Sequence, residues 1–134
     1  MAPRATGDRG SITGFVAIVA VALVMVAGMA YDGGQVVAAQ GQARSYAAKA
    51  ARAGAQEIDL TSLRSTGATV LDPVRAEASA LAYLDEVDAF GTVTVDGTTV
   101  TVTVTVTQPM LILPVPDRTV IVTQTATALD EETP

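Results

Sequence analysis

The residues best suited to chemistry in this sequence are its carboxylates, because the chain contains neither histidine nor cysteine. The usual general bases, thiol nucleophiles and transition-metal ligands are therefore missing. The densest group of acids is Asp85, Glu86 and Asp88, on neighbouring positions of an expected helix. Carboxylates that hold a hard cation must converge on one point, so we interpret this group as a solvated helix face. The sequence predicts no enzyme, no catalytic residue, no cofactor, no metal site and no small-molecule substrate.

The charge balance is acidic and uneven along the chain. Eight basic residues stand against fourteen acidic ones, which gives a formal net charge of −6. Residues 33–56 carry three cations and no acid, whereas eleven of the acids lie from Asp59 onward. Because an acidic surface repels phosphates, we expect no nucleic-acid partner.

An uncharged run of twenty residues, 12–31, dominates the N-terminal part of the chain. As a helix it has the length that crosses a bilayer core of about 30 Å, so the membrane is a predicted partner. Arg4 and Arg9 outnumber Asp8 in the flank 1–11. By the positive-inside rule this predicts a single-pass protein with a cytoplasmic N-terminus and the rest of the chain outside.

A cleaved signal peptide is the alternative interpretation of the same run. Gly28 and Ala30 precede Tyr31 in a pattern that signal peptidase accepts, and cleavage there would release a small secreted β-rich binding module. The run is longer than a usual signal core, and helical periodicity continues beyond it. Both features favour a retained anchor.

Residues 32–58 are expected to form an amphipathic helix outside the membrane. Its small side chains recur on one face, opposite a polar stripe. Small residues let another element approach closely. The predicted helix-packing surface consists of Ala39, Ala43, Ala47, Ala50 and Gly54. The element packed there is either this chain's own sheet or a partner helix.

The junction between the span and this helix reads Asp32, Gly33, Gly34. Paired glycines commonly bend a helix, so we expect a hinge at the membrane exit. Asp32 could serve a special backbone conformation, or it could pair with a charge on a partner.

Residues 59–129 are expected to form a small α+β ectodomain, followed by a disordered tail, 130–134. After a connection over 59–71, Asp72 and Pro73 are typical of a helix start. The helix has an apolar stripe that includes Val74, Leu81 and Leu84.

The stretch 92–107 alternates valine and threonine around Asp96-Gly97, which indicates a type I′ hairpin with its valines on one face. Val95 is expected to pair with Thr98. A third strand is expected over 118–128. The connecting segment 108–116, "QPMLILPVP", is apolar and rich in proline, so it is either tucked against a helix or an exposed contact patch.

Several of these features together resemble the TadE/TadG-like proteins of tight-adherence (Flp) pilus systems, especially actinobacterial ones. They are Arg9-Gly10 before the span, the Asp32-Gly33-Gly34 exit, and the Ala-rich helix 47–56. The order of short helix, valine-rich hairpin, apolar loop and last strand is similar too.

The resemblance implies a minor pilin-like subunit or a non-incorporated assembly accessory at the bacterial cell surface, with other pilus-assembly proteins as partners. It also implies Gly10 as the residue that a prepilin peptidase would process. Pilin-like members carry a glutamate five residues after that glycine, whereas this chain has Phe15. The departure argues against processing and favours the accessory.

Overall fold

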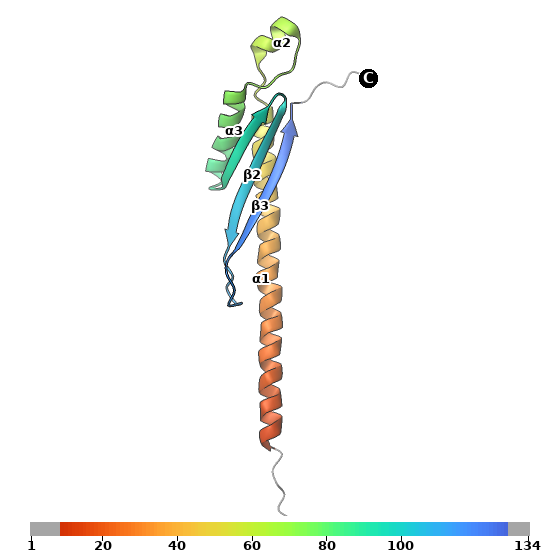
Figure 1. Cartoon of the computed structure of the whole chain (residues 1–134), viewed down its shortest axis with the longest axis vertical. Helices are drawn as coiled ribbons and strands as arrows, with labels where there is room; N and C mark the ends of the chain where they lie inside the picture. The colour runs from red at the N-terminus through yellow and green to blue at the C-terminus, as the bar shows by residue number, and fades with distance from the viewer. Residues whose placement is uncertain (1–8, 129–134) are drawn as a thin grey trace, which may run out of the picture.

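The computed structural model describes residues 9–128, which form one long helix, two shorter helices and a three-stranded sheet (Figure 1). The elements are α1 Arg9–Ala55, α2 Leu60–Thr66, α3 Pro73–Glu86, β1 Phe90–Asp96, β2 Thr99–Gln108 and β3 Arg118–Thr127. The predicted α+β class, with a long N-terminal helix and a small antiparallel sheet, is confirmed. The predicted tail, Arg4 and Asp8 lie outside the described residues.

The helix α1 is the spine of the molecule. It contains no proline, so every internal N–H can join the helical hydrogen-bond ladder. Its N-terminal half projects beyond the rest of the chain, while the sheet and α3 pack along its C-terminal half (Figure 1). Large apolar side chains of the projecting half are exposed, for example Ile18 at 71% and Val24 at 64%.

The sheet has the order β1-β2-β3, and both pairings are antiparallel. The valines of β2 that face α1 are completely buried, and they are Val100, Val102 and Val104. Alternate threonines lie on the opposite face, where the Thr103 and Thr123 hydroxyls form a hydrogen bond of 2.9 Å. The predicted division into a valine face and a threonine face is therefore confirmed.

The hairpin turn differs from the prediction. Val95 pairs with Val100 and Asp96 with Thr99, so Gly97 and Thr98 form the turn. Of these two, only Gly97 has a positive φ, at 59°, and a glycine at the first central position is the pattern of a type II′ turn. The type I′ assignment and the pairing of Val95 with Thr98 were wrong, by a slip of two residues that leaves every side chain on its predicted face.

The helix α3 begins as the sequence predicts. The Asp72 carboxylate accepts the N–H groups of Val74 and Arg75 at 3.1 and 3.2 Å. Its buried face differs from the predicted apolar stripe, because Val74 is 77% exposed and Leu81 is 41% exposed. The side chains it buries are Ala76, Ala80 and Leu84.

Close approach to α1 explains this choice of small residues. A Cβ atom built on Gly54 would lie 2.7 Å from the Ala76 carbonyl oxygen. Larger side chains on that face of α3 would hold the two helices apart, so alanine packs where valine and leucine were expected.

The short helix α2 lies in the segment that was predicted to be a plain connection. The Asp59 carboxylate caps it, accepting the Ser62 hydroxyl at 2.5 Å and the Thr61 N–H at 2.9 Å. These bonds, that of Ser62 first, hold the pKa of Asp59 below its usual range. Gly67 ends the helix with a φ of 72°.

Candidate functional site

Asp32 is the charged side chain that the described part of the fold buries, with 2% of its surface exposed. Its carboxylate accepts three successive backbone N–H groups from the segment between β2 and β3. The distances are 3.3 Å from Leu111, 3.1 Å from Ile112 and 2.8 Å from Leu113. A buried carboxylate is stable when donors replace its lost water, so Asp32 fastens this segment to α1.

The segment that Asp32 holds is the apolar loop, which we define as residues 109–116. Gln108, included in the prediction, is the last residue of β2. The apolar loop runs back along α1 toward its projecting half (Figure 1). Ile112 lies on the backbone of Gly28, because a Cβ atom there would come within 2.5 Å of Ile112 Cγ2. Both predicted alternatives are therefore partly right, because the loop is tucked against the helix and still exposes apolar side chains.

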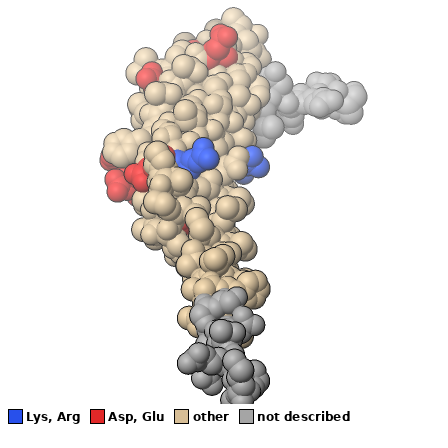
Figure 2. Space-filling view, turned by 60° about the horizontal axis from the view of Figure 1, so that its bottom comes forward, with Lys and Arg blue, Asp and Glu red and all other residues tan. Residues whose placement is uncertain are grey.

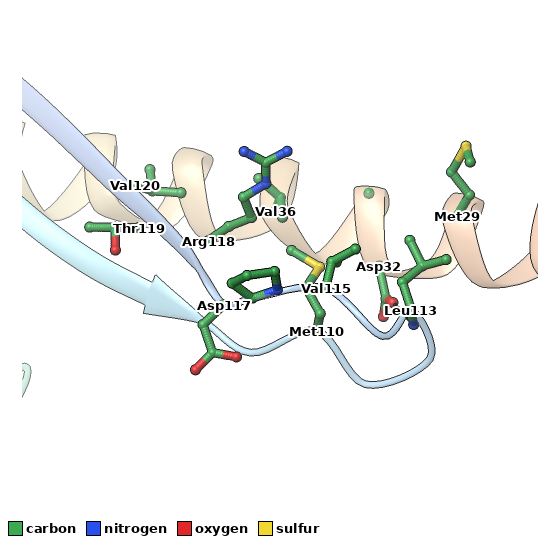
Figure 3. Close-up of a pocket in the computed structure, with 12 residues that line it drawn as sticks. Met29, Asp32, Val36, Met110, Leu113, Val115, Asp117, Arg118, Thr119 and Val120 are labelled. Carbon is green, nitrogen blue, oxygen red and sulfur yellow. Dashed lines mark hydrogen bonds between the residues drawn. The ribbon is translucent and has the colours of Figure 1, made fainter.

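A groove of about 780 Å³ opens where α1, the apolar loop and the start of β3 meet. In Figure 3 the Asp32 side chain points from α1 toward the apolar loop and lies next to Leu113. Further lining residues are Met29, Val36, Met110 and Val120. The walls are mostly apolar, with polar side chains of residues 117–119 at the start of β3, and the buried Asp32 carboxylate already accepts three amide N–H groups. The groove therefore suits mainly apolar contact.

The position of Asp32 follows from helical periodicity. Asp32 and Val36 continue the spacing of Ala39, Ala43 and Ala47, so they lie on the face of α1 that the rest of the chain covers. This periodicity is the signal in the sequence that places Asp32 inside, toward this chain's own loop.

The predicted helix-packing surface lies under the chain's own sheet and α3. Ala43, Ala47 and Ala50 are fully buried, and Ala39 is 5% exposed. Gly54 lies against Ala76 and Val100. Of the two elements considered for this face, the structure places the chain's own sheet there.

The predicted hinge at Asp32, Gly33 and Gly34 does not appear as a break in the described backbone. α1 is continuous through all three residues, and neither glycine has a positive φ. Both glycines are exposed, with no atom within 4 Å of a built Cβ. Helical hydrogen bonds and the anchoring of Asp32 hold this turn in regular geometry.

The remaining predicted residues are less informative. Gly10 lies in the first turn of α1. Asp85, Glu86 and Asp88 are exposed. Within residues 9–128, no group of three or more acidic side chains is placed to hold a metal ion.

The charged side chains follow the division of α1 into a projecting N-terminal half and a packed C-terminal half. In Figure 2 most of the coloured charged side chains lie over the upper part of the face shown, and the lower part of the described surface is tan. One helix among the described residues is long and apolar enough to cross a membrane.

Comparison with known proteins bears on the N-terminal part of the chain. No curated protein and no solved structure matches the chain. Residues 10–57, which contain the apolar run, Asp32 and the small-residue face, match the model of the Tad family, described as "Putative Flp pilus-assembly TadE/G-like". The resemblance drawn from the sequence is thereby confirmed: over residues 10–57 the chain is similar to the TadE/G-like pilus-assembly family.

Proposed function

We propose that this chain is a single-pass membrane protein of a Flp-type pilus or secretion assembly system. It acts as a minor pilin-like subunit or as a non-incorporated assembly accessory, with its N-terminus in the cytoplasm and the sheet outside. The observation that carries the proposal is the match of residues 10–57 to the pilus-assembly family. A helix whose apolar first half is uncovered supports it.

The working surface of such a protein is the part that its own fold leaves free. The small residues of the second half of α1 are covered by the chain's own sheet, so they cannot receive a partner helix. Ala30 and Gly34, spaced four apart, are exposed and lie near the end of the apolar run. Small residues at this spacing let two helices approach closely in or near a membrane. We infer that a helix of another pilus-assembly protein packs on this pair.

Residue chemistry gives no support to an enzymatic role. The chain has no histidine or cysteine, and the groove at Asp32 contains a carboxylate that three amides already satisfy. We propose that the protein works by binding and by its position in the membrane.

Membrane retention tests the proposal most directly. After a carbonate wash the full-length protein should remain in the membrane pellet, with a mature N-terminus at Met1 or Ser11. A soluble form that begins at Tyr31 would show that the run is a cleaved signal, and the secreted binding module would replace this proposal.

The inferred helix contact has a matched pair of variants. Gly34→Leu should reduce co-purification of other pilus-assembly proteins from membranes of the native host. Gln40→Leu, which places the same side chain at an exposed position on another side of α1, should leave it unchanged. Equal co-purification with both variants would argue against a contact at Ala30 and Gly34.

A further inference from the structure

The apolar loop exposes several apolar side chains outside the projecting half of α1. Residues 109–116 carry no charge. Leu111 is 68% exposed, and Ile112 and Val115 are each 48% exposed. Contiguous apolar surface of this kind on a small protein marks a contact with another apolar phase or partner.

The loop lies beside the end of the apolar run. Ile112 contacts Gly28, three residues before Tyr31 closes the run. At 1.5 Å per helical residue, this contact lies about 4.5 Å inside the end of the run. The exposed faces of the loop and of α1, where Met29 is 64% exposed, therefore form one continuous apolar surface.

Most N–H groups of the loop are paired within the protein. Its three prolines have no N–H group. Asp32 accepts the N–H groups of the three consecutive residues 111–113, and the Val115 N–H donates to the Leu113 carbonyl at 2.8 Å. Irregular backbone tolerates a medium poor in water only when its polar groups are paired inside the protein. The N–H groups of the apolar loop meet that condition in large part.

We propose that the apolar loop inserts into the lipid bilayer beside α1, at the boundary between headgroups and acyl chains. The proposal rests on the membrane anchoring proposed above and adds a second point of contact. Interfacial elements bury their apolar face about 5–10 Å into this boundary, which is close to the depth of about 4.5 Å for the contact with Gly28. Tyr31, 48% exposed at the same end of the run, is an aromatic side chain of the type enriched at this level.

Lipid is favoured over a protein partner by continuity and by charge. The surface of the loop continues that of the predicted span, and charged residues begin immediately after it at Asp117 and Arg118. Two contacts with one leaflet would fix the height and tilt of the sheet above the membrane. If the helix were the only contact with the membrane, the sheet would tilt whenever the helix tilts.

The absence of native cysteine makes a labelling experiment direct. Full-length Leu111→Cys, Val24→Cys and Val74→Cys variants are labelled with an environment-sensitive fluorophore and reconstituted into phosphatidylcholine vesicles. Quenching by lipids that carry a nitroxide near the carbonyl end of the acyl chain is measured for each. Leu111, Val24 and Val74 are all strongly exposed apolar residues, but Val24 lies in the predicted span and Val74 on the far end of the fold.

The proposal expects the labels at Leu111 and Val24 to lose fluorescence, while the label at Val74 does not. Quenching at Val24 without quenching at Leu111 overturns the loop insertion and leaves the membrane anchor intact. No quenching at either position overturns the anchor, and the proposed function with it. A Leu111 label that stays unquenched in lipid and becomes protected only when pilus-assembly proteins are co-reconstituted also overturns the proposal, because a protein then covers the loop.

Discussion

The Asp32 carboxylate accepts the backbone N–H of Leu113 at 2.8 Å, although the two residues are 81 positions apart in the chain. With the neighbouring bonds to Leu111 and Ile112, this contact joins the end of the apolar run to the loop that connects β2 and β3. Hydrogen bonds to a charged acceptor are stronger than neutral ones. One side chain thus supplies the three hydrogen bonds that hold the apolar loop beside the predicted span.

Asp32→Asn should release the apolar loop while leaving the fold intact. The amide keeps one acceptor oxygen for three donors and loses the negative charge that strengthens each bond. Hydrogen exchange of the full-length protein in detergent should show faster exchange for the amides of residues 111–113. Asp85→Asn removes a charge from an exposed position on α3 and is the control. Unchanged protection of the loop amides in Asp32→Asn would mean that packing of Ile112 on Gly28 alone holds the loop.

Gly97→Val should destabilise the hairpin, because a β-branched residue is forced to a positive φ. Strain of this kind costs about 1–3 kcal/mol in the free energy of unfolding. Denaturant unfolding of the full-length protein measures the loss. Thr98→Val is the matched control, since Thr98 shares the turn without a positive φ. Similar losses in both variants would contradict the turn assigned here.

The sequence predicted the faces of the sheet better than its register. Alternating valine and threonine fix which side chains point inward, and a slip of two residues preserves that alternation. Asp96-Gly97 can supply a positive φ to more than one two-residue turn, so local signals did not separate the two pairings. The pairing with β3, which places Val102 opposite Gln124 and Val104 opposite Val122, involves residues that the hairpin pattern does not contain.

The contact between Asp32 and the apolar loop could not be predicted from the sequence, for a different reason. No periodicity links residues about 80 positions apart, and an acid after an apolar run is ordinarily expected to face water. The available signal was the spacing of Asp32 with the small-residue face of α1. The stripe expected on α3 was right at Leu84 and wrong at Val74 and Leu81, because large apolar side chains are not the ones that fit closest to α1. An alanine-rich partner instead buries small side chains such as Ala76 and Ala80.

Ala47→Leu should overfill the core between α1 and the sheet. Ala47 is fully buried, and added methylenes in a packed core cost about 1–3 kcal/mol. Thermal unfolding of the full-length protein in detergent should show a lower midpoint. Ala48→Leu, at a half-buried neighbouring position, should lower it less. Equal midpoints for the wild type and Ala47→Leu would contradict the packing described here.

Acid should loosen α2 through Asp59. Hydrogen bonds from Ser62 and Thr61 lower its pKa in the folded state. The capping contribution is therefore fully present above the unfolded pKa of about 3.9 and is lost as the pH falls through the lower folded pKa. Hydrogen exchange of residues 60–66, corrected for intrinsic rates, should show this loss. Asp59→Asn, which retains a capping oxygen but does not titrate, should show no such dependence from this site.

Gly28→Ala should displace the apolar loop even though alanine favours the helix. In a helix interior alanine is more favourable than glycine by about 1 kcal/mol, so a glycine free of contacts would tolerate the change. At Gly28, however, the new Cβ would lie 2.5 Å from Ile112 Cγ2 and 3.3 Å from Ile112 Cβ. Isoleucine is stiff about its first side-chain torsion, so relief of this clash requires the loop to move. Gly14→Ala is the matched control in the same apolar run, because nothing lies within 4 Å of its built Cβ. Faster amide exchange at residues 111–113 in Gly28→Ala, with no change in Gly14→Ala, is the expected result. Equal protection in both variants would show that Ile112 does not rest on Gly28, and the depth assigned to the loop would lose its structural basis.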